Sequence, residues 1–213
     1  MTRILYLTPG VLCPFASDAC RAACLGHSSG RMKLPSSVVA RDKRTAAYRA
    51  EPTYFLAKLR AELAALAIDA KRRRVVPAAR LNGTSDLAWE RLHPELFGDF
   101  GSIQFYDYTK SAERMQQFLR RDRWPANYHL TFSADATTDP EGNRSREFLS
   151  KGVNVAIPFA SQLPRSWWGV GVLDGDRHDA RFLDPAGQVV GLRAKGAAIA
   201  DKNNFVFQTE AAI

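Results

Sequence analysis

The sequence contains no long hydrophobic run and very little cysteine. No window of its 213 residues approaches the roughly 18 consecutive apolar residues that a membrane-spanning helix needs. The first residues, MTRILYLTPGVL, form a short apolar run that Pro9 and Gly10 interrupt, and no small-residue cleavage site follows, so they do not resemble a secretory signal. We therefore expect a cytoplasmic protein with no membrane partner, in which thiols stay reduced.

Acidic residues are fewer than basic ones. The chain has 30 Lys and Arg against 22 Asp and Glu, which gives a net charge of +8 and a pI near 9.7. This balance favours polyanionic partners or anionic ligands, although a basic protein needs no such partner. The densest run, KRRR at 71–74, falls at the end of a predicted helix, where cations complement the helix dipole. Charge alone therefore does not indicate nucleic-acid binding.

Short apolar, β-branched runs alternate with helical patterns along the chain, and no linker or repeat divides it. This alternation predicts parallel strands joined by right-handed crossovers. Six strand–helix units within one domain, residues 1–213, predict a partial (β/α)6 TIM-like barrel, because a full barrel usually takes roughly 250 residues. Residues 178–196 then predict a short C-terminal β-hairpin extension that turns on DPAG. The predicted strands are 3–7, 74–82, 102–108, 127–133, 153–159 and 167–174, and the predicted helices are 36–50, 52–70, 86–97, 111–122 and 145–152.

Polar clusters follow nearly every predicted strand. Because ligands of parallel α/β folds bind beyond the carboxyl ends of the strands, these clusters predict a site. Each cluster taken alone also fits an ordinary helix cap or turn. The clusters are the cysteine segment, Asn82–Asp86, Tyr106–Lys110, Phe132–Asp135 and Leu173–Asp179.

The three cysteines, Cys13, Cys20 and Cys24, lie within twelve positions directly after the first predicted strand. Together with His27 they have the spacing Cys-x6-Cys-x3-Cys-x2-His, close to a zinc site with four ligands. Without His27, three thiolates would hold three irons of a four-iron cluster and leave the fourth iron open. Thiolates suit both metals, so the spacing does not decide between them.

Several segments give the chain two resemblances. It resembles the phage-associated, uncharacterised family called gene product 88 in its cysteine loop, RLNGTSD, YDYTK, YHLTFS and DGDRHDARFLDP. More distantly, it is similar to radical S-adenosylmethionine (SAM) proteins related to spore photoproduct lyase. In those proteins a cysteine loop follows the first strand, Ser-Asp the second, Thr-Lys the third and a serine the fourth; NGTSDLAWE, IQFYDYTKSAERM and YHLTFSAD match in order. The place of the cysteine loop therefore favours an iron–sulfur cluster over zinc.

The second resemblance implies a barrel of radical SAM type and an enzyme with two cofactors, a [4Fe-4S] cluster and SAM. It implies that the reduced cluster cleaves SAM to methionine and a 5′-deoxyadenosyl radical. The radical would abstract hydrogen from an unknown substrate such as a nucleic acid or nucleotide. An electron donor such as flavodoxin or ferredoxin would reduce the cluster, in a bacterium or a phage-infected host cell. The implied metal ligands are Cys13, Cys20 and Cys24. The implied SAM contacts are Ser85 and Asp86 for the amino group or ribose, Lys110 for the carboxylate and Ser133 for the ribose or methionyl part, with Asn82 as a further cofactor-binding residue.

The last polar cluster is the candidate for substrate chemistry. Asp174, Asp176 and His178 combine carboxylates with an imidazole, which suits proton transfer or a second metal. A charged turn balanced by Arg177 and Arg181 is the structural alternative. Two further hypotheses stay open for the whole chain: a non-catalytic zinc protein with a Cys3His site that binds nucleic acid through its basic surface, and a phage accessory protein that keeps the fold without the chemistry.

Overall fold

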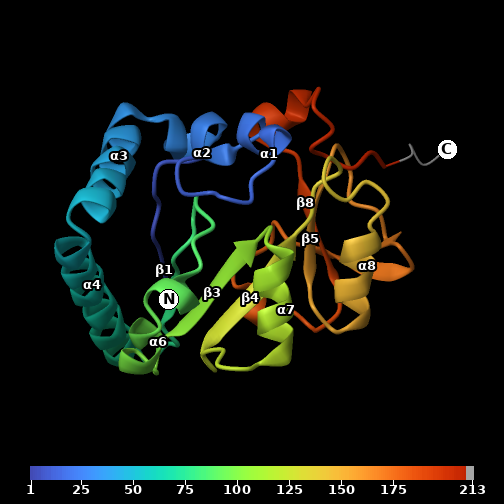
Figure 1. Cartoon of the computed structure of the whole chain (residues 1–213). Helices are drawn as coiled ribbons and strands as arrows, with labels where there is room; N and C mark the ends of the chain where they lie inside the picture. The colour runs from blue at the N-terminus through green and yellow to red at the C-terminus, as the bar shows by residue number, and fades with distance from the viewer. Residues whose placement is uncertain (210–213) are drawn as a thin grey trace.

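The computed structural model describes residues 1–209, which form an eight-stranded sheet with helices packed against it (Figure 1). The strand order is β1-β2-β3-β4-β5-β8-β7-β6, and every pair is parallel except β6–β7. Within the described residues β1 and β6 are not paired with each other, so the sheet is open. The strands are β1 Thr2–Ile4, β2 Ala78–Arg80, β3 Gln104–Thr109, β4 Tyr128–Ser133, β5 Val155–Phe159, β6 Ser166–Trp167, β7 Val170–Asp174 and β8 Val189–Arg193.

The helices begin and end where the local sequence allows. Pro35 and Pro52 occupy the first turns of α3 and α4, where a missing N–H costs nothing, and Arg74 ends α4 in a left-handed conformation. Ser111 caps α7 by accepting a hydrogen bond from the Arg114 backbone N–H. The α-helices are α1 Asp18–Ala22, α2 Leu25–Ser28, α3 Pro35–Ala50, α4 Pro52–Arg73, α5 Trp89–Leu92, α6 Glu95–Asp99, α7 Ala112–Arg120 and α8 Asn143–Ser150; the 3-10 helices are η1 Gly30–Lys33, η2 Arg181–Leu183 and η3 Gly196–Ala200.

The core lies between the central strands and the helices that cover them. Phe105, Leu130, Val155 and Ile157 are fully buried on neighbouring strands. Burial of each such side chain contributes about 1.5–3 kcal/mol, so the central strands are the rigid part of the molecule. No helix among residues 1–209 combines the length and the apolar character needed to cross a membrane.

The predicted parallel pairing is confirmed for β1 to β5, which also pair in sequence order. The open sheet does not show a TIM-like barrel. The C-terminal hairpin predicted for residues 178–196 is wrong: β8 lies between β5 and β7 and runs parallel to both. The physical reason is that Val189 and Val190 are fully buried, which requires a central strand with neighbours on both sides.

A real hairpin lies one segment earlier, where a single strand over 167–174 is predicted. Trp168 and Gly169 have φ angles of 52° and 77°, which suit a two-residue turn that reverses the chain. The turn divides the segment into β6 and β7, and it places β6 at the edge of the sheet.

Candidate functional site

A cavity of about 540 Å³ lies at the carboxyl ends of the parallel strands. Figure 1 shows α1 and α2 across the end of the sheet toward which β3 points. The cysteine loop and the sheet together therefore enclose the cavity. Its lining includes Cys20 and Cys24 from the loop, Gly83 and Thr84 after β2, Tyr108 from β3, Ser133 from β4, Pro158 from β5, Arg193 from β8, and Asp176, His178 and Asp179 after β7.

The loop that carries the cysteines is fixed by its own polar contacts. Arg21 donates to the carbonyl oxygens of Gly10 at 2.6 Å and of Cys13 at 3.4 Å, which closes the loop on itself. Ser17 accepts a hydrogen bond from the Cys20 backbone N–H at 3.0 Å and donates to Asp135 at 3.4 Å, which attaches the loop to the end of β4. The loop is thus held over the cavity from both ends.

The three thiols are free and partly buried. Burial raises the pKa of the Cys20 thiol to about 11, and the neighbouring Lys110 ammonium opposes this rise. Burial also raises the pKa of Cys13, whose sulfur donates to the Thr84 carbonyl oxygen at 3.4 Å. Negative charge on Cys24 would raise the pKa of both other thiols, so the three groups lie close enough to interact. At neutral pH Cys13 and Cys20 are protonated in the absence of a metal.

The described residues present no assembled metal site. Among residues 1–209, no three His, Cys, Asp or Glu side chains are arranged to hold one metal ion. His27 is exposed and does not line the cavity. A closed zinc site needs its four ligands on one ion, so this arrangement does not present it.

Asn82 and Asp86, two predicted SAM contacts, instead have protein partners in this structure. The Asn82 side-chain oxygen accepts hydrogen bonds from Ser85, the Leu87 N–H and the Trp89 indole. Asp86 is buried and accepts from Arg114 at 2.6 Å and from the Lys110 backbone N–H at 2.9 Å. Neither residue lines the cavity. Both instead lie beneath its rim, the segments that follow the strand ends, and hold that rim in place.

Arg114, behind the rim, connects this support to the sheet. It is fully buried and donates to both Asp86 and Glu90. It also donates to the Tyr128 hydroxyl, which in turn donates to Asp107 at 2.8 Å. Burial raises the pKa of the Asp107 carboxyl to about 7. The polar residues behind the rim thus form one continuous buried network.

The predicted contacts Lys110 and Ser133 lie next to each other at the end of β3 and β4. The Lys110 ammonium donates to Asp135 at 2.7 Å and to the Ser133 carbonyl oxygen at 3.2 Å. Burial opposes ionisation of Asp135, yet the ion pair with Lys110 holds its pKa below the ordinary value. Ser133 lines the cavity, and Lys110 is close enough to Cys20 to lower the pKa of that thiol.

The predicted catalytic cluster divides at the mouth of the cavity. Asp176 and His178 line it, whereas Asp174 does not. Asp174 and Asp176 are paired with Arg193, and Asp176 also accepts from Lys195 at 2.6 Å. These ion pairs are in contact with solvent, so each contributes little to stability. They place positive and negative side chains around the entrance of the cavity without holding the entrance in one conformation.

Arg80 and Asp179 form a polar pair in the cavity wall that the motif analysis does not assign. Arg80 donates to both carboxylate oxygens of Asp179, at 3.1 and 3.2 Å, and stacks 4.6 Å from the Tyr108 ring centroid. The Tyr106 hydroxyl donates to the same carboxylate at 2.9 Å. One sequence feature could have revealed this pair: Arg80 stands between the apolar residues of a predicted strand, and a buried cation needs a partner inside the fold.

These features define a class: an α/β protein with an open, mostly parallel sheet and a cysteine-lined cavity at the carboxyl ends of its strands. The chain belongs to the gene product 88 family, whose sequence model matches residues 1–209, and this confirms the first of the two resemblances. Comparison with curated protein sequences and with solved structures finds no match.

Proposed function

We propose that this protein is a radical SAM-type iron–sulfur enzyme. One observation carries the proposal: the cysteine loop directly follows β1 and opens onto a cavity at the carboxyl ends of parallel strands that pair in sequence order. In this proposal Cys13, Cys20 and Cys24 ligate a [4Fe-4S] cluster. The strands β1 to β5 together with β8 would then supply the six strands of a partial barrel of radical SAM type, with β7 as a further parallel strand beyond β8.

The cavity supports the proposal by its size and its lining. Its volume of about 540 Å³ falls in the range of small-molecule sites, so it can hold a ligand of the size of SAM. Ser133 and the Thr84 segment give it polar groups at the ends of β4 and β2, on either side of β3. Lys110, held by Asp135 and close enough to Cys20 to lower the pKa of that thiol, would exchange Asp135 for the SAM carboxylate.

Metal binding would change the protonation states of the free thiols. Thiols must lose their protons to bind iron, so loading the cluster would release protons from Cys13 and Cys20. Lys110 compensates part of the negative charge that then accumulates in the loop. Asn82, Asp86 and Arg114 hold the rim in place while this charge changes.

When bound, the cluster would pass one electron from a flavodoxin or ferredoxin to SAM, whose carbon–sulfur bond would break to give methionine and a 5′-deoxyadenosyl radical. The residues of this chain would position the two molecules and exclude water. The substrate would then lie toward the mouth formed by Asp176, His178 and Arg193, with Arg80, Asp179 and Tyr108 in the wall.

Anaerobic reconstitution with iron and sulfide tests the metal part of the proposal. The wild-type protein should bind about four irons and four sulfides, with broad absorption near ~400 nm. Cys13→Ser, Cys20→Ser and Cys24→Ser should each lose most of the iron, whereas His27→Ala should retain it. A single tightly held zinc that is lost in His27→Ala, or no iron uptake at all, would contradict the proposal and favour the zinc hypothesis or an accessory protein.

A further inference from the structure

The net charge of the molecule is confined to one part of the fold. Residues 31–74, which span η1, α3 and α4, contain 12 of the 30 Lys and Arg and four of the 22 Asp and Glu. The rest of the chain contains 18 of each, so this segment accounts for the whole net charge of +8. A basic composition spread evenly would need no partner, whereas this concentration builds a local positive field.

Most of these cations have no acidic partner. In the described part of the chain, nine exposed Lys and Arg side chains of the segment make no ion pair with a carboxylate: Arg31, Lys33, Lys43, Arg44, Arg49, Lys58, Lys71, Arg73 and Arg74. By contrast, Arg60 pairs with Asp99, and Arg72 pairs with Asp69. The positive field is therefore not cancelled at close range.

Three of the nine cations meet at a second cavity, of about 490 Å³, between β1, β2 and the helix pair α3–α4. Lys43 and Arg44 reach it from α3, and Lys58 reaches it from α4. Arg3 also lines it but is paired with Glu62 at 2.7 Å. The rest of the lining is mainly apolar and includes Ile4, Leu5, Ala47, Phe55, Leu59 and Leu63. The exposed ring of Tyr54 also lines the cavity.

This combination fits one ligand chemistry. Cations around an apolar and aromatic recess suit a polymer that carries phosphates on its backbone and flat apolar faces on its bases. An anionic membrane would contact protruding apolar side chains such as Val39 and Ile68, which lie outside the cavity lining, whereas Phe55 and Leu63 inside it are only 7% and 3% exposed and form a recess. In addition, β1 is an edge strand, so one row of its backbone donors and acceptors is free of strand pairing.

We infer that the cavity between β1 and the helix pair α3–α4 is a docking site for single-stranded nucleic acid. Lys43, Arg44 and Lys58 contact the phosphates, and an unstacked base enters the apolar cavity. A duplex binds less tightly because its bases are already stacked and paired. Arg80 lines this cavity and the cysteine-lined cavity alike, so a strand docked here lies beside the candidate site. The inference does not rest on the iron–sulfur proposal.

Fluorescence anisotropy with a short labelled oligothymidylate tests the phosphate contacts on the metal-free full chain. The triple variant Lys43→Ala, Arg44→Ala, Lys58→Ala should bind at least about tenfold more weakly at low salt. The slope of log K against log salt should become less steep by about two, because each phosphate contact on a single strand contributes roughly 0.7.

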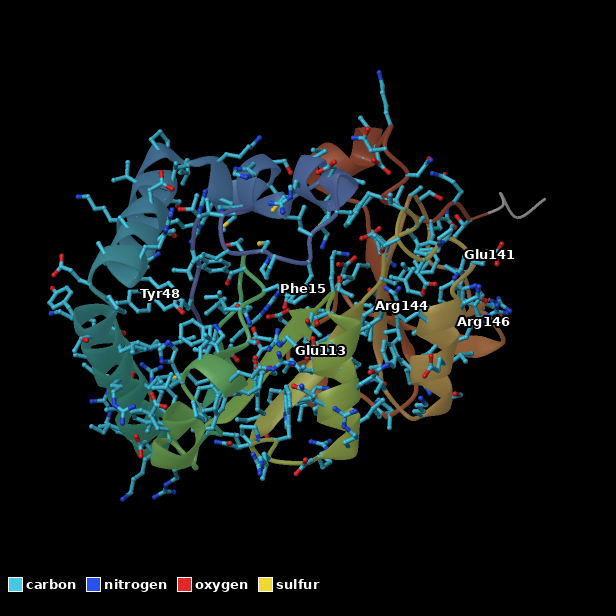
Figure 2. The ribbon with its side chains drawn as sticks, in the orientation of Figure 1. Phe15, Tyr48, Glu113, Glu141, Arg144 and Arg146 are labelled. Carbon is cyan, nitrogen blue, oxygen red and sulfur yellow. The ribbon has the colours of Figure 1, made fainter. Side chains whose placement is uncertain are left out.

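The matched control removes three cations from a helix that packs against β5 rather than β1. Arg144→Ala, Arg146→Ala, Lys151→Ala alters α8 and its end, and Figure 2 shows Arg144 and Arg146 far from Tyr48 of α3. The two triple variants have equal net charge, so non-specific attraction weakens equally in both. Equal loss of binding in both variants, or equal affinity for the oligothymidylate and a duplex of the same length, would overturn the inference.

A cavity-filling variant tests the base contact separately. Ala47→Leu adds apolar volume to the cavity wall and keeps a good helix former in α3. Affinity should fall severalfold while the salt slope stays the same, and unchanged affinity would overturn the placement of a base in the cavity.

Vesicles of phosphatidylserine and phosphatidylcholine test a membrane as the alternative partner. If the Lys43, Arg44, Lys58 triple variant loses vesicle binding but keeps oligothymidylate binding, the site is a membrane site and the inference fails.

Discussion

Two polar clusters lie at the same end of the sheet and differ in burial. The buried network (Asp86, Glu90, Asp107, Arg114 and Tyr128) is closed to solvent, and each member is bonded to another. The exposed pairs (Asp174 and Asp176 with Arg193 and Lys195) share the mouth of the cavity with water. The first cluster has no bonding capacity to spare for a ligand, whereas the second can exchange partners at small cost.

This difference assigns separate tasks to residues that look alike in the sequence. The buried network fixes the segment Asn82–Asp86, which supplies the Thr84 carbonyl contact to Cys13. The exposed pairs leave the cavity mouth adjustable. Rigidity under the cysteine loop and adaptability at the mouth are what a site needs if it holds one cofactor firmly and admits a variable partner.

The largest expected effect comes from opening the buried network. Arg114→Met keeps the aliphatic volume but leaves Asp86 and Glu90 without their cation, so the free energy of unfolding should fall by about 3–5 kcal/mol. Urea denaturation followed by circular dichroism measures it. Arg91→Met is the control, because Arg91 pairs with Glu113 at the surface and should change stability by less than about 1 kcal/mol. Similar effects of the two variants would mean that the network is not closed.

The next effect is a pH dependence that Asp107 imposes. Burial raises its pKa to about 7 from an ordinary value of 3.8, so the folded protein binds a proton more tightly than the unfolded chain. The stabilisation from this carboxyl is complete below about pH 4 and is lost as the pH rises through about 7. Asp107→Asn removes this dependence, so its stability relative to wild type should rise from pH 4 to 7 by on the order of 3 kcal/mol.

Urea midpoints across that pH range measure the Asp107 effect. Asp122→Asn, at an exposed carboxyl, should leave the wild-type pH dependence in place. A stability difference between wild type and Asp107→Asn that stays constant with pH would show that the Asp107 carboxyl is ionised throughout.

A smaller effect concerns the thiol nearest to Lys110. Because the Lys110 ammonium opposes the burial-driven rise in the pKa of Cys20, Lys110→Met should raise that pKa further and reduce the thiolate fraction. In the metal-free protein, alkylation of Cys20 by iodoacetamide near pH 9 should slow by about threefold or more, as measured by mass spectrometry of the Cys20 peptide. Lys151→Met should not change the rate, and faster alkylation in Lys110→Met would contradict the contact.

The smallest effect is expected at the exposed pairs. Asp174→Asn removes a partly exposed carboxylate whose partner, Arg193, keeps Asp176. The urea midpoint should therefore be unchanged within error. A loss of stability comparable to that of Arg114→Met would remove the distinction between the two clusters.

The alternation of strands and helices was predictable from the sequence, because each run is short, apolar and bounded by turn or cap residues. The place of β8 was not predictable in the same way. An apolar run such as QVVGL fits an edge hairpin and a central strand equally well, and only pairing with β5, more than 30 residues earlier in the chain, decides between them.

The candidate site shows the same limit. Motif position placed Cys20, Cys24, Ser133, Asp176 and His178 at one cavity. It could not show that Asp86 is bonded to Arg114, because no local pattern connects two residues that far apart in the chain. Arg80 was hidden for a similar reason: its partner Asp179 comes from a loop near the other end of the chain.

Cleavage of SAM tests the central claim most directly. The reconstituted protein, reduced with dithionite under anaerobic conditions and incubated with SAM, should release methionine and 5′-deoxyadenosine, and Cys20→Ser treated identically should release neither. Chromatography with mass detection measures both products. A wild-type protein that contains four irons and four sulfides but forms no 5′-deoxyadenosine would contradict the account.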